Sequence, residues 1–240
     1  MATSAETAYA LHGVAQDVRE DGRSRLDYRH MSVELDLFPQ ASGSARLRLG
    51  PTDVLVGVVA ELAEPDADTP QCGRILVSVD CACASSRMPD YGAADGALAW
   101  LAAALQPLYS AASIPAALEA LGVVRGKQCW QLRVHAQLLR CDGCPLDALA
   151  LAIWAALRST RIPRLAAAAS PAGGSGAGGG GAGGGGAGGA ASQLDLDLDE
   201  SLDESVPFDT SELPTYVTLA SAGNFLVADC TLTERRVAGR

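Results

Sequence analysis

Two cysteine pairs have a spacing that could support metal binding or redox chemistry. Cys141 and Cys144 form a C-x-x-C where a strand is predicted to meet a helix, and Cys81 and Cys83 form a C-x-C at the predicted end of another strand. Four thiolates would suit a zinc ion, and a cysteine at a helix start would suit thiol exchange. Such short pairings are weak motifs. We therefore interpret both as turns with incidental cysteines and predict no metal site and no cofactor.

Clusters of arginines are the second group that could do chemistry. A guanidinium fork matches the oxygens of a phosphate group, and arginine is also favoured at contacts between subunits. The sequence leaves both roles open. The candidates for contact with RNA, phosphate or a neighbouring subunit are Arg23, Arg25, Arg29, Arg46, Arg48, Arg158, Arg161 and Arg164.

No pattern of catalytic residues is evident. His12, His30 and His135 are scattered, and the chain has neither a Gly-x-Ser-x-Gly elbow nor a His-Glu-x-x-His pair. The glycine tract lacks the Lys-Ser/Thr ending of a phosphate-binding loop and does not lead from a strand into a helix. We predict no catalytic residue.

The elements that would position these residues start with three strands. Residues 28–38 and 44–49 alternate apolar with polar side chains, and residues 54–62 form a nearly continuous apolar run. These patterns predict two half-buried strands and one strand covered on both faces. The short joints between them contain Pro39 and Gly50-Pro51, so we expect an antiparallel meander.

Later segments supply helices and further strands. Apolar side chains at helical spacing predict helices over 5–20, 93–109 and 144–160, with a short helix that ends near residue 121. Period-two alternation predicts strands over 74–84 and 128–140, another strand over 162–168, and a hairpin over 214–229.

Residues 171–192 have a different composition from the rest of the chain. Half of all glycines, 13 of 26, lie between positions 173 and 189, which is typical of a flexible linker. An acidic run of alternating Leu and Asp follows at 194–204 and is expected to stay solvated unless it is paired. We expect three parts: a first half with its core helix over 1–170, a linker with an acidic loop over 171–212, and a short last part over 213–240.

The net charge of −10 is concentrated in one region. Residues 193–212 hold eight acids and no base, so the rest of the chain has 18 bases against 20 acids. This balance is unlike that of an autonomous nucleic-acid binder. The amino terminus does not resemble a secretory signal, and no apolar run reaches the length of a membrane span. These features predict a soluble intracellular protein.

Several stretches together carry a family resemblance: 21–29, 43–46, 50–58, 79–81, 127–132, 138–143, 147–148, 155–164, 214–219 and 229–234. The most specific of them is Ala155-Ala156-Leu157-Arg158-Ser159-Thr160-Arg161-Ile162-Pro163-Arg164. These stretches resemble an RNase PH-like domain, and in particular the catalytically silent branch of the ring subunits of the eukaryotic RNA exosome. The resemblance covers roughly residues 6–168 and 206–234.

The resemblance implies an α/β (α+β) RNase PH fold with two βαβα halves of the ribosomal protein S5 domain 2-like type. It also implies a place in a hetero-hexameric ring with other RNase PH-like subunits, exosome cap proteins and RNA, in the nucleus, nucleolus and cytoplasm. Family members that cleave RNA by phosphorolysis need a carboxylate as general acid in the second half. The segment after the hairpin has no Asp-rich sequence that could supply it.

The expected function is therefore that of a non-catalytic scaffold in 3′-to-5′ RNA processing and degradation. The alternatives are an active phosphorolytic 3′-to-5′ exoribonuclease, and a free-standing α/β protein that docks other proteins through its acidic loop. The family continues past residues 229–234 with another strand and a long helix, whereas this chain ends at Arg240. We therefore expect its second half to be incomplete and to expose an apolar sheet face.

Overall fold

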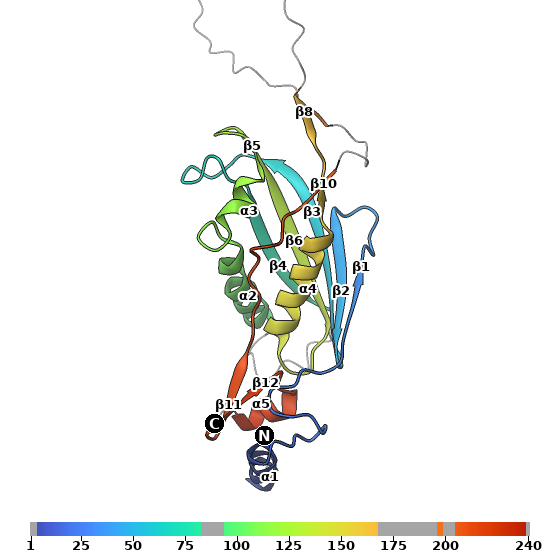
Figure 1. The fold of residues 1–240 in the computed structure, drawn as a ribbon, viewed down its shortest axis with the longest axis vertical. Helices are drawn as coiled ribbons and strands as arrows, with labels where there is room; N and C mark the ends of the chain where they lie inside the picture. Colours follow the sequence, from blue (N-terminus) through green and yellow to red (C-terminus); the bar gives the residue numbers. More distant parts are fainter. Residues whose placement is uncertain (1–3, 83–93, 168–195, 199–204, 239–240) are drawn as a thin grey trace, which may run out of the picture. The chain divides into compact units, whose positions relative to one another are not determined.

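The computed structural model describes residues 4–82, 94–167, 196–198 and 205–238 (Figure 1). The chain divides into two compact units, one of residues 1–161 and 207–240 and the other of residues 162–206. Cys83 and the predicted linker at 171–192 lie outside the described residues. No helix in the described ranges is long and apolar enough to cross a membrane.

A six-stranded sheet forms the centre of the larger unit. Its strand order is β1-β2-β3-β6-β4, and the short β5 pairs with β6. β4 runs parallel to β6, and the other neighbours are antiparallel. The order confirms the predicted meander of the first three strands. The strands are β1 (Met31–Leu35), β2 (Gly43–Leu49), β3 (Thr52–Ala63), β4 (Arg74–Cys81), β5 (Gly122–Val124) and β6 (Gln128–Arg140).

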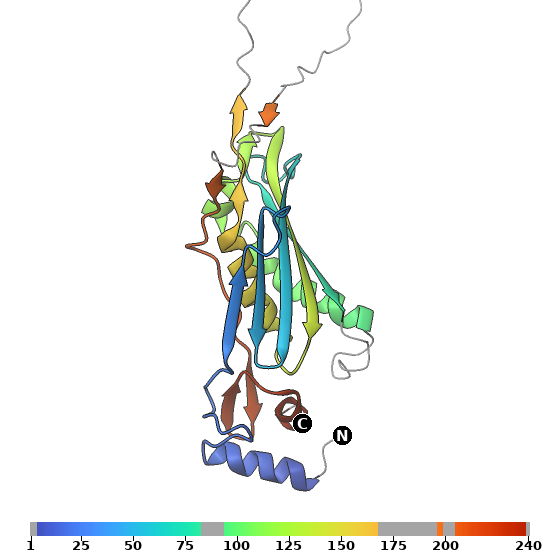
Figure 2. The same ribbon diagram turned by 90° about the vertical axis from the view of Figure 1, so that its right-hand side faces the viewer.

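Helices cover one face of this sheet (Figures 1 and 2). α4 (Pro145–Ser159) packs on β2 and β3, and α2 (Ala94–Leu105) packs on β4. A 3-10 turn (Gln106–Tyr109) and α3 (Pro115–Glu119) follow α2. Every second residue of a strand points towards the helices, and residues three or four apart on α4 point towards the sheet. These two sets of side chains pack against each other. The core between the layers includes Ala45, Leu47, Leu49, Val54, Val56, Val58, Leu132, Val134, Ala136, Leu138, Leu149, Ile153 and Leu157, all buried.

The carboxyl end of α4 lies in direct contact with the start of β2. A Cβ atom placed on Gly43 would lie 2.4 Å from Thr160 Oγ1 and 2.7 Å from the Ala156 carbonyl oxygen. The Ser44 amide donates to Ser159 Oγ at 3.1 Å, and this hydroxyl also lies 3.2 Å from the Ser44 carbonyl oxygen. Only glycine allows so close an approach here, so Gly43 fixes where the helix ends on the sheet.

The two ends of the larger unit pack against each other. α1 (Ser4–Ala15) lies beside a hairpin of β11 (Leu219–Ala222) and β12 (Phe225–Ala228), which is followed by α5 (Leu232–Ala238) (Figures 1 and 2). These segments meet in a small apolar cluster with the start of α4. Its buried members are Val14, Cys144, Ala222, Val227 and Cys230.

Most predicted elements are confirmed, and their ends differ where the backbone turns. The helix predicted over 5–20 ends at Ala15, and Asp17 has a positive φ of 60°. The strand predicted over 28–38 is limited to Met31–Leu35, and Asp36 has a φ of 56°. Left-handed backbone continues neither a helix nor a strand. The predicted strand over 128–140 agrees with β6.

Two short strands pair within the part of the smaller unit that the structure describes. β8 (Leu165–Ala167) pairs antiparallel with β9 (Leu196–Leu198), with Leu165 opposite Leu198. The sequence predicted a solvated acidic run at 194–204 unless it was paired, and three of its residues are paired here. The single strand predicted over 162–168 is divided into β7 (Arg161–Ile162) and β8, and β7 pairs with β10 (Val206–Pro207).

Candidate functional site

The eight candidate arginines separate into two groups by their partners. Members of the first group form ion pairs with carboxylates of this chain: Arg23, Arg25, Arg29, Arg46 and Arg48. Members of the second group are exposed residues at the end of α4 or in the smaller unit: Arg158, Arg161 and Arg164. Within the first group, Arg29 is buried in its ion pair and Arg25 and Arg48 are paired near the surface, whereas the second group faces solvent.

Arg29 and Asp229 form the centre of the first group. Arg29 Nε donates to Asp229 Oδ2 at 2.9 Å and Nη2 donates to Oδ1 at 2.7 Å, while the Arg29 amide adds a bond of 2.9 Å. Burial would raise the pKa of Asp229, but the hydrogen bonds and charge of Arg29 outweigh it and lower that pKa. Arg23 adds a further bond to Oδ2 at 3.1 Å. This carboxylate is therefore a fully engaged anion.

Arg19 extends this cluster and was not among the predicted residues. It is buried, and its Nη1 donates to the Ala228 carbonyl at 3.0 Å and its Nη2 to the Asp229 carbonyl at 2.9 Å. Asp229 has a positive φ of 45°, a conformation that is uncommon outside glycine. The bonds from Arg19 and Arg29 hold the chain in that conformation directly after β12.

Glu234 binds Arg19 and caps α5. Arg19 Nε donates to Glu234 Oε1 at 2.8 Å, and Nη2 contacts Oε2. Glu234 also accepts from the Thr231 amide at 2.9 Å, and its own amide donates to Thr231 Oγ1 at 3.3 Å. This reciprocal pair is a capping box. Burial would raise the pKa of Glu234, but Arg19 and the Thr231 amide lower it.

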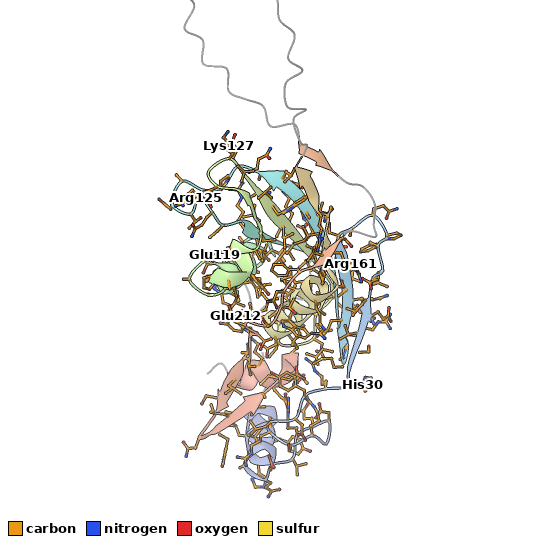
Figure 3. All side chains as sticks on the ribbon, turned by 45° about the horizontal axis from the view of Figure 1, so that its top comes forward. His30, Glu119, Arg125, Lys127, Arg161 and Glu212 are labelled. Atoms are coloured by element: carbon orange, nitrogen blue, oxygen red, sulfur yellow. The ribbon has the colours of Figure 1, made fainter. Side chains whose placement is uncertain are left out.

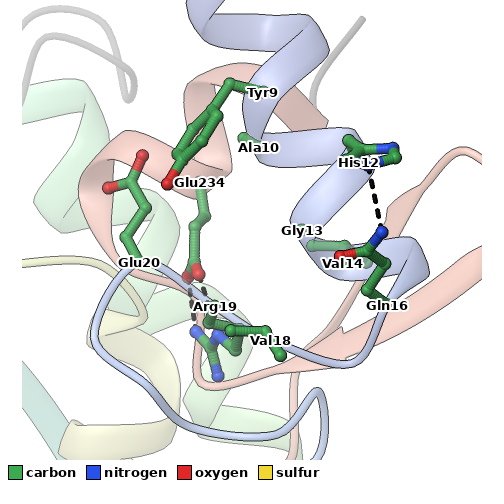
Figure 4. Close-up of a pocket in the computed structure, with 10 residues that line it drawn as sticks. All are labelled: Tyr9, Ala10, His12, Gly13, Val14, Gln16, Val18, Arg19, Glu20 and Glu234. Carbon is green, nitrogen blue, oxygen red and sulfur yellow. Dashed lines mark hydrogen bonds and ion pairs between the residues drawn. The ribbon is translucent and has the colours of Figure 1, made fainter.

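A pocket of about 190 Å³ opens above the Arg19–Glu234 pair, between α1 and the segment that follows it (Figure 4). Four of its polar side chains pair with each other: His12 lies 3.1 Å from Gln16 Nε2, and Arg19 binds Glu234. Tyr9 and Val18 at the pocket are exposed apolar side chains. The lining described here does not combine a nucleophile with a base.

Asp147 forms a second buried anchor, which links α4 to both ends of the chain. Its carboxylate accepts from the Thr218 amide at 2.9 Å, from Thr218 Oγ1 at 2.5 Å and from the Tyr28 hydroxyl at 3.2 Å. Burial, and then the charge of Asp147, raise the pKa of Tyr28 to about 12. Asp147 therefore positions the segment before β11 against the amino terminus of α4.

Arg46 and Arg48 lie on the face of the sheet opposite α4. Arg46 binds Asp53 in a bidentate pair with distances of 3.0 and 2.7 Å. That hydrogen bonding lowers the pKa of Asp53. Arg48 lies 3.4 Å from Glu34 and 3.9 Å from Asp53. The charges of this pair of arginines are balanced locally, which weakens their attraction for phosphate.

The second group begins at the last turn of α4. The Arg158 guanidinium lies over the Trp154 ring, 5.6 Å from its centroid, and its side chain is exposed. Arg161 is exposed two residues after α4 ends, where its amide donates to the Ser42 carbonyl at 2.8 Å (Figure 3). Neither has an ion pair within the described ranges. Arg164 is exposed in the smaller unit.

The cysteines of the C-x-x-C are free thiols, of which Cys144 is buried and Cys141 is partly buried. Burial raises the pKa of Cys141 to about 11 and that of Cys144 to about 12. Cys144 Sγ lies 3.7 Å from the Cys230 carbonyl oxygen. In the part of the chain that the structure describes, no group of three or more His, Cys, Asp or Glu side chains is arranged to hold a metal. Thiols with raised pKa values are poor nucleophiles at neutral pH.

Comparison with known proteins places this geometry in a family. Residues 27–163 match the model of the 3′ exoribonuclease family, domain 1. The exosome complex component Rrp42 of Thermococcus kodakarensis is 31% identical over 220 residues, covering 91% of this chain and 71% of that protein. Its counterpart in Pyrococcus furiosus is 29% identical over 230 residues, covering 95% and 73%.

Two solved structures share the fold. A chain of an archaeal exosome core matches with a TM-score of 0.68 and 27% identity, covering 97% of this chain and 76% of that one. The Archaeoglobus fulgidus exosome with RNA bound to the active site matches with a TM-score of 0.71 and 27% identity, covering 97% and 78%. This chain therefore belongs to the 3′ exoribonuclease family and has the α/β RNase PH fold.

Proposed function

We propose that this chain is a non-catalytic scaffold subunit of the RNA exosome ring that supports 3′-to-5′ RNA processing and degradation. The observation that carries the proposal is the state of Asp229 and Glu234, the buried carboxylates that follow the hairpin. A general acid must hold a proton at the working pH. Arginine partners lower the pKa of both carboxyls, so both are ionised acceptors that hold the fold together.

Membership of the family supports a place in a ring. The similar Rrp42 proteins are exosome components, and the similar solved chains come from exosome assemblies. The partners would be other RNase PH-like ring subunits in a hetero-hexamer, together with cap proteins and RNA. The processes would be rRNA maturation and mRNA turnover, in the nucleus, nucleolus and cytoplasm.

Arg158 and Arg161 are the best placed of the predicted arginines for contact with RNA. Both are exposed near one end of α4, and neither is neutralised by a carboxylate in the described ranges. Guanidinium groups without a local counter-ion contribute most to phosphate binding. Arg164 shares their exposure but belongs to the smaller unit.

The last part of the chain, from residue 213, is proposed to belong to a second RNase PH-like half. β11 pairs only with β12 among the described strands. The exposed apolar side chains of this region are Val217, Leu219 and Leu226, which are 59%, 50% and 54% exposed. An apolar sheet face of this kind is typical of a surface that further polypeptide covers in the assembled protein.

Phosphorolysis distinguishes this function from that of an active exoribonuclease. The purified chain would be incubated with RNA and inorganic phosphate, alone and with RNase PH-like partners, and nucleoside diphosphates would be quantified. We expect no release by the chain alone, and an unchanged rate per assembled complex for the Asp229→Asn and Glu234→Gln variants. Phosphate-dependent release by the chain alone, lost on replacing one of its own carboxylates, would establish the exoribonuclease instead.

A further inference from the structure

A second pocket, of about 330 Å³, lies at the amino-terminal end of α4, where α2, the segment before β11 and α5 come together (Figure 1). It is separate from the pocket of about 190 Å³ beside α1. Its described lining contains none of the arginines proposed to contact RNA. Arg158 lies in the last turn of α4, roughly 20 Å along the helix axis from this pocket.

The walls of this pocket are formed largely by aromatic and aliphatic side chains. Trp100 on α2 is 50% exposed and is the most exposed of the three tryptophans of the chain. Tyr216, from the segment before β11, is partly buried and lines the same pocket. Large aromatic rings that remain half exposed beside a cavity are typical of a ligand site, because a ligand can cover their apolar faces.

The pocket also carries positive charge. Among its described lining residues, Arg235 on α5 is the one with a charged side chain. Cys144 remains an uncharged thiol, since burial raises its pKa to about 12. The amino terminus of α4, which begins at Pro145, adds the positive end of the helix dipole and has no side-chain cap. Asp147 in the first turn of α4 is not part of the lining.

We propose that this pocket binds a nucleoside monophosphate, with the base stacked on Trp100 beside Tyr216 and the phosphate bound by Arg235. Nucleobases stack on aromatic side chains, and a guanidinium fork matches phosphate oxygens. Ligand pockets usually measure about 300–1,000 Å³, so a pocket at the lower end of this range suits one nucleotide better than a strand of RNA. This inference does not depend on a place in the exosome ring.

One wall of the pocket is held in place before any ligand binds. Thr218, which belongs to the lining, donates its amide to Asp147 at 2.9 Å and its hydroxyl to the same carboxylate. This anchor fixes the segment that carries Tyr216, so little conformational entropy is lost on binding. The complementary charges of Arg235 and a phosphate favour a nucleotide over an apolar segment of polypeptide as the occupant.

Isothermal titration calorimetry of the full chain with adenosine 5′-monophosphate tests the site. We expect saturable binding of one nucleotide per chain. Trp100→Leu should weaken it by about tenfold or more, because a stacked base is lost. Tyr9→Leu removes an aromatic ring that is 71% exposed at the other pocket, and this control should bind as the unmodified chain does. No saturable binding at millimolar nucleotide, or equal affinity in Trp100→Leu, would overturn the proposal.

A comparison of two ligands tests the role of Arg235. Arg235→Gln should weaken the binding of adenosine 5′-monophosphate by about tenfold or more, because a charged hydrogen bond to phosphate is lost. The same variant should bind adenosine, which has no phosphate, as the unmodified chain does. Thermal unfolding of each variant would confirm that it folds. An equal loss of affinity for both ligands would contradict the phosphate contact.

Single-stranded oligoadenylate distinguishes a free nucleotide from an RNA strand. We expect Trp100→Leu to leave the affinity for this strand unchanged, since the exposed arginines lie at the other end of α4. If the strand bound through Trp100 while adenosine 5′-monophosphate did not bind, the pocket would belong to RNA and the proposal would be wrong. Assembly with ring subunits is measured separately, so failure of the nucleotide site would not affect the proposed function.

Discussion

Arg29 and Asp229 are 200 residues apart in the sequence and form a buried, bidentate ion pair. Arg29 lies just before the first strand of the sheet, and Asp229 lies just after the last strand of the C-terminal hairpin. Because Asp229 also binds Arg23, this one carboxylate joins the beginning and the end of the larger unit. We therefore expect folding stability, and its dependence on pH, to depend on the charge of Asp229.

Removing the arginine should destabilise the protein strongly. Arg29→Met leaves the buried Asp229 carboxylate with only part of its neutralising charge, and such losses cost about 3–5 kcal/mol. The matched control is Arg48→Met. The Arg48 side chain is 44% exposed, and its loss should cost less than about 1 kcal/mol. Urea denaturation measures both values. Similar losses in the two variants would show that the Arg29–Asp229 pair has no special role.

Acid should weaken the fold through the same carboxylates. The pKa values of Asp229 and Glu234 are lowered in the folded state, so folding favours their ionised forms. Their contribution is complete above their unfolded pKa values, 3.8 and 4.5, and is lost as the pH falls through the folded values. The urea concentration at the unfolding midpoint should decrease as the pH drops below about 4.5. This decrease should be smaller in the Asp229→Asn variant. A midpoint that stays constant on acidification would contradict this assignment.

The Asp147 anchor should control how firmly the segment before β11 is held. Asp147→Ala removes the acceptor of the Thr218 amide and hydroxyl, and each buried donor left without a partner costs about 1–3 kcal/mol. Hydrogen exchange at Thr218 and Leu219 should become faster. Tyr28→Phe removes only one donor to the same carboxylate and should have a smaller effect. Unchanged exchange in Asp147→Ala would mean that other contacts hold this segment.

Gly43 should not tolerate a side chain. In Gly43→Ala the new Cβ would press on Thr160 Oγ1 and the Ala156 carbonyl, and overpacking of this kind costs about 1–3 kcal/mol. Gly96→Ala is the control, because no atom lies within 4 Å of its Cβ position in α2. In a helix that change should stabilise by about 0.5–1 kcal/mol. Thermal unfolding should therefore shift in opposite directions for the two variants.

The exposed arginines should contribute to RNA affinity more than the paired ones. Arg158→Gln and Arg161→Gln each remove a charge without a local counter-ion, whereas Arg48→Gln removes one that lies near Glu34 and Asp53. Fluorescence anisotropy with single-stranded RNA, on the assembled complex, should show weaker binding and a shallower salt dependence only for the first two. An equal loss of RNA affinity in all three variants would show that the exposed arginines contribute no more than Arg48.

The sequence predicted the elements whose patterns are local. β6 and α4 follow from hydrophobic periodicity, because each has a buried face along most of its length. β3 was correctly predicted as a strand, but the prediction that both its faces are covered was wrong: its buried residues alternate only as far as Val58, and Val59 is 37% exposed. The end of β1 was predicted too late, since the backbone reversal at Asp36 leaves no mark on the apolar pattern. Alternation of Leu and Asp could not show that residues 196–198 pair with β8, because pairing depends on a distant segment.

The role of the candidate arginines towards RNA, phosphate or a neighbouring subunit stays a prediction, and their partners within the chain could not be predicted. The sequence marks arginines as possible phosphate ligands, but it cannot show that Arg29 meets a carboxylate 200 residues away. Arg19 was missed because a lone arginine after a helix has no distinctive pattern. Two local signals were available: the Thr231-x-x-Glu234 spacing of a capping box, and Arg46 and Asp53, which lie near the two ends of a tight turn between paired strands.

The central claim is that this chain takes a place in an exosome ring, and affinity purification tests it most directly. The tagged 240-residue chain would be isolated from its native cells and the eluate analysed by mass spectrometry. We predict recovery of the other RNase PH-like ring subunits and the cap proteins in comparable amounts. Recovery of chaperones without any ring subunit would contradict the account.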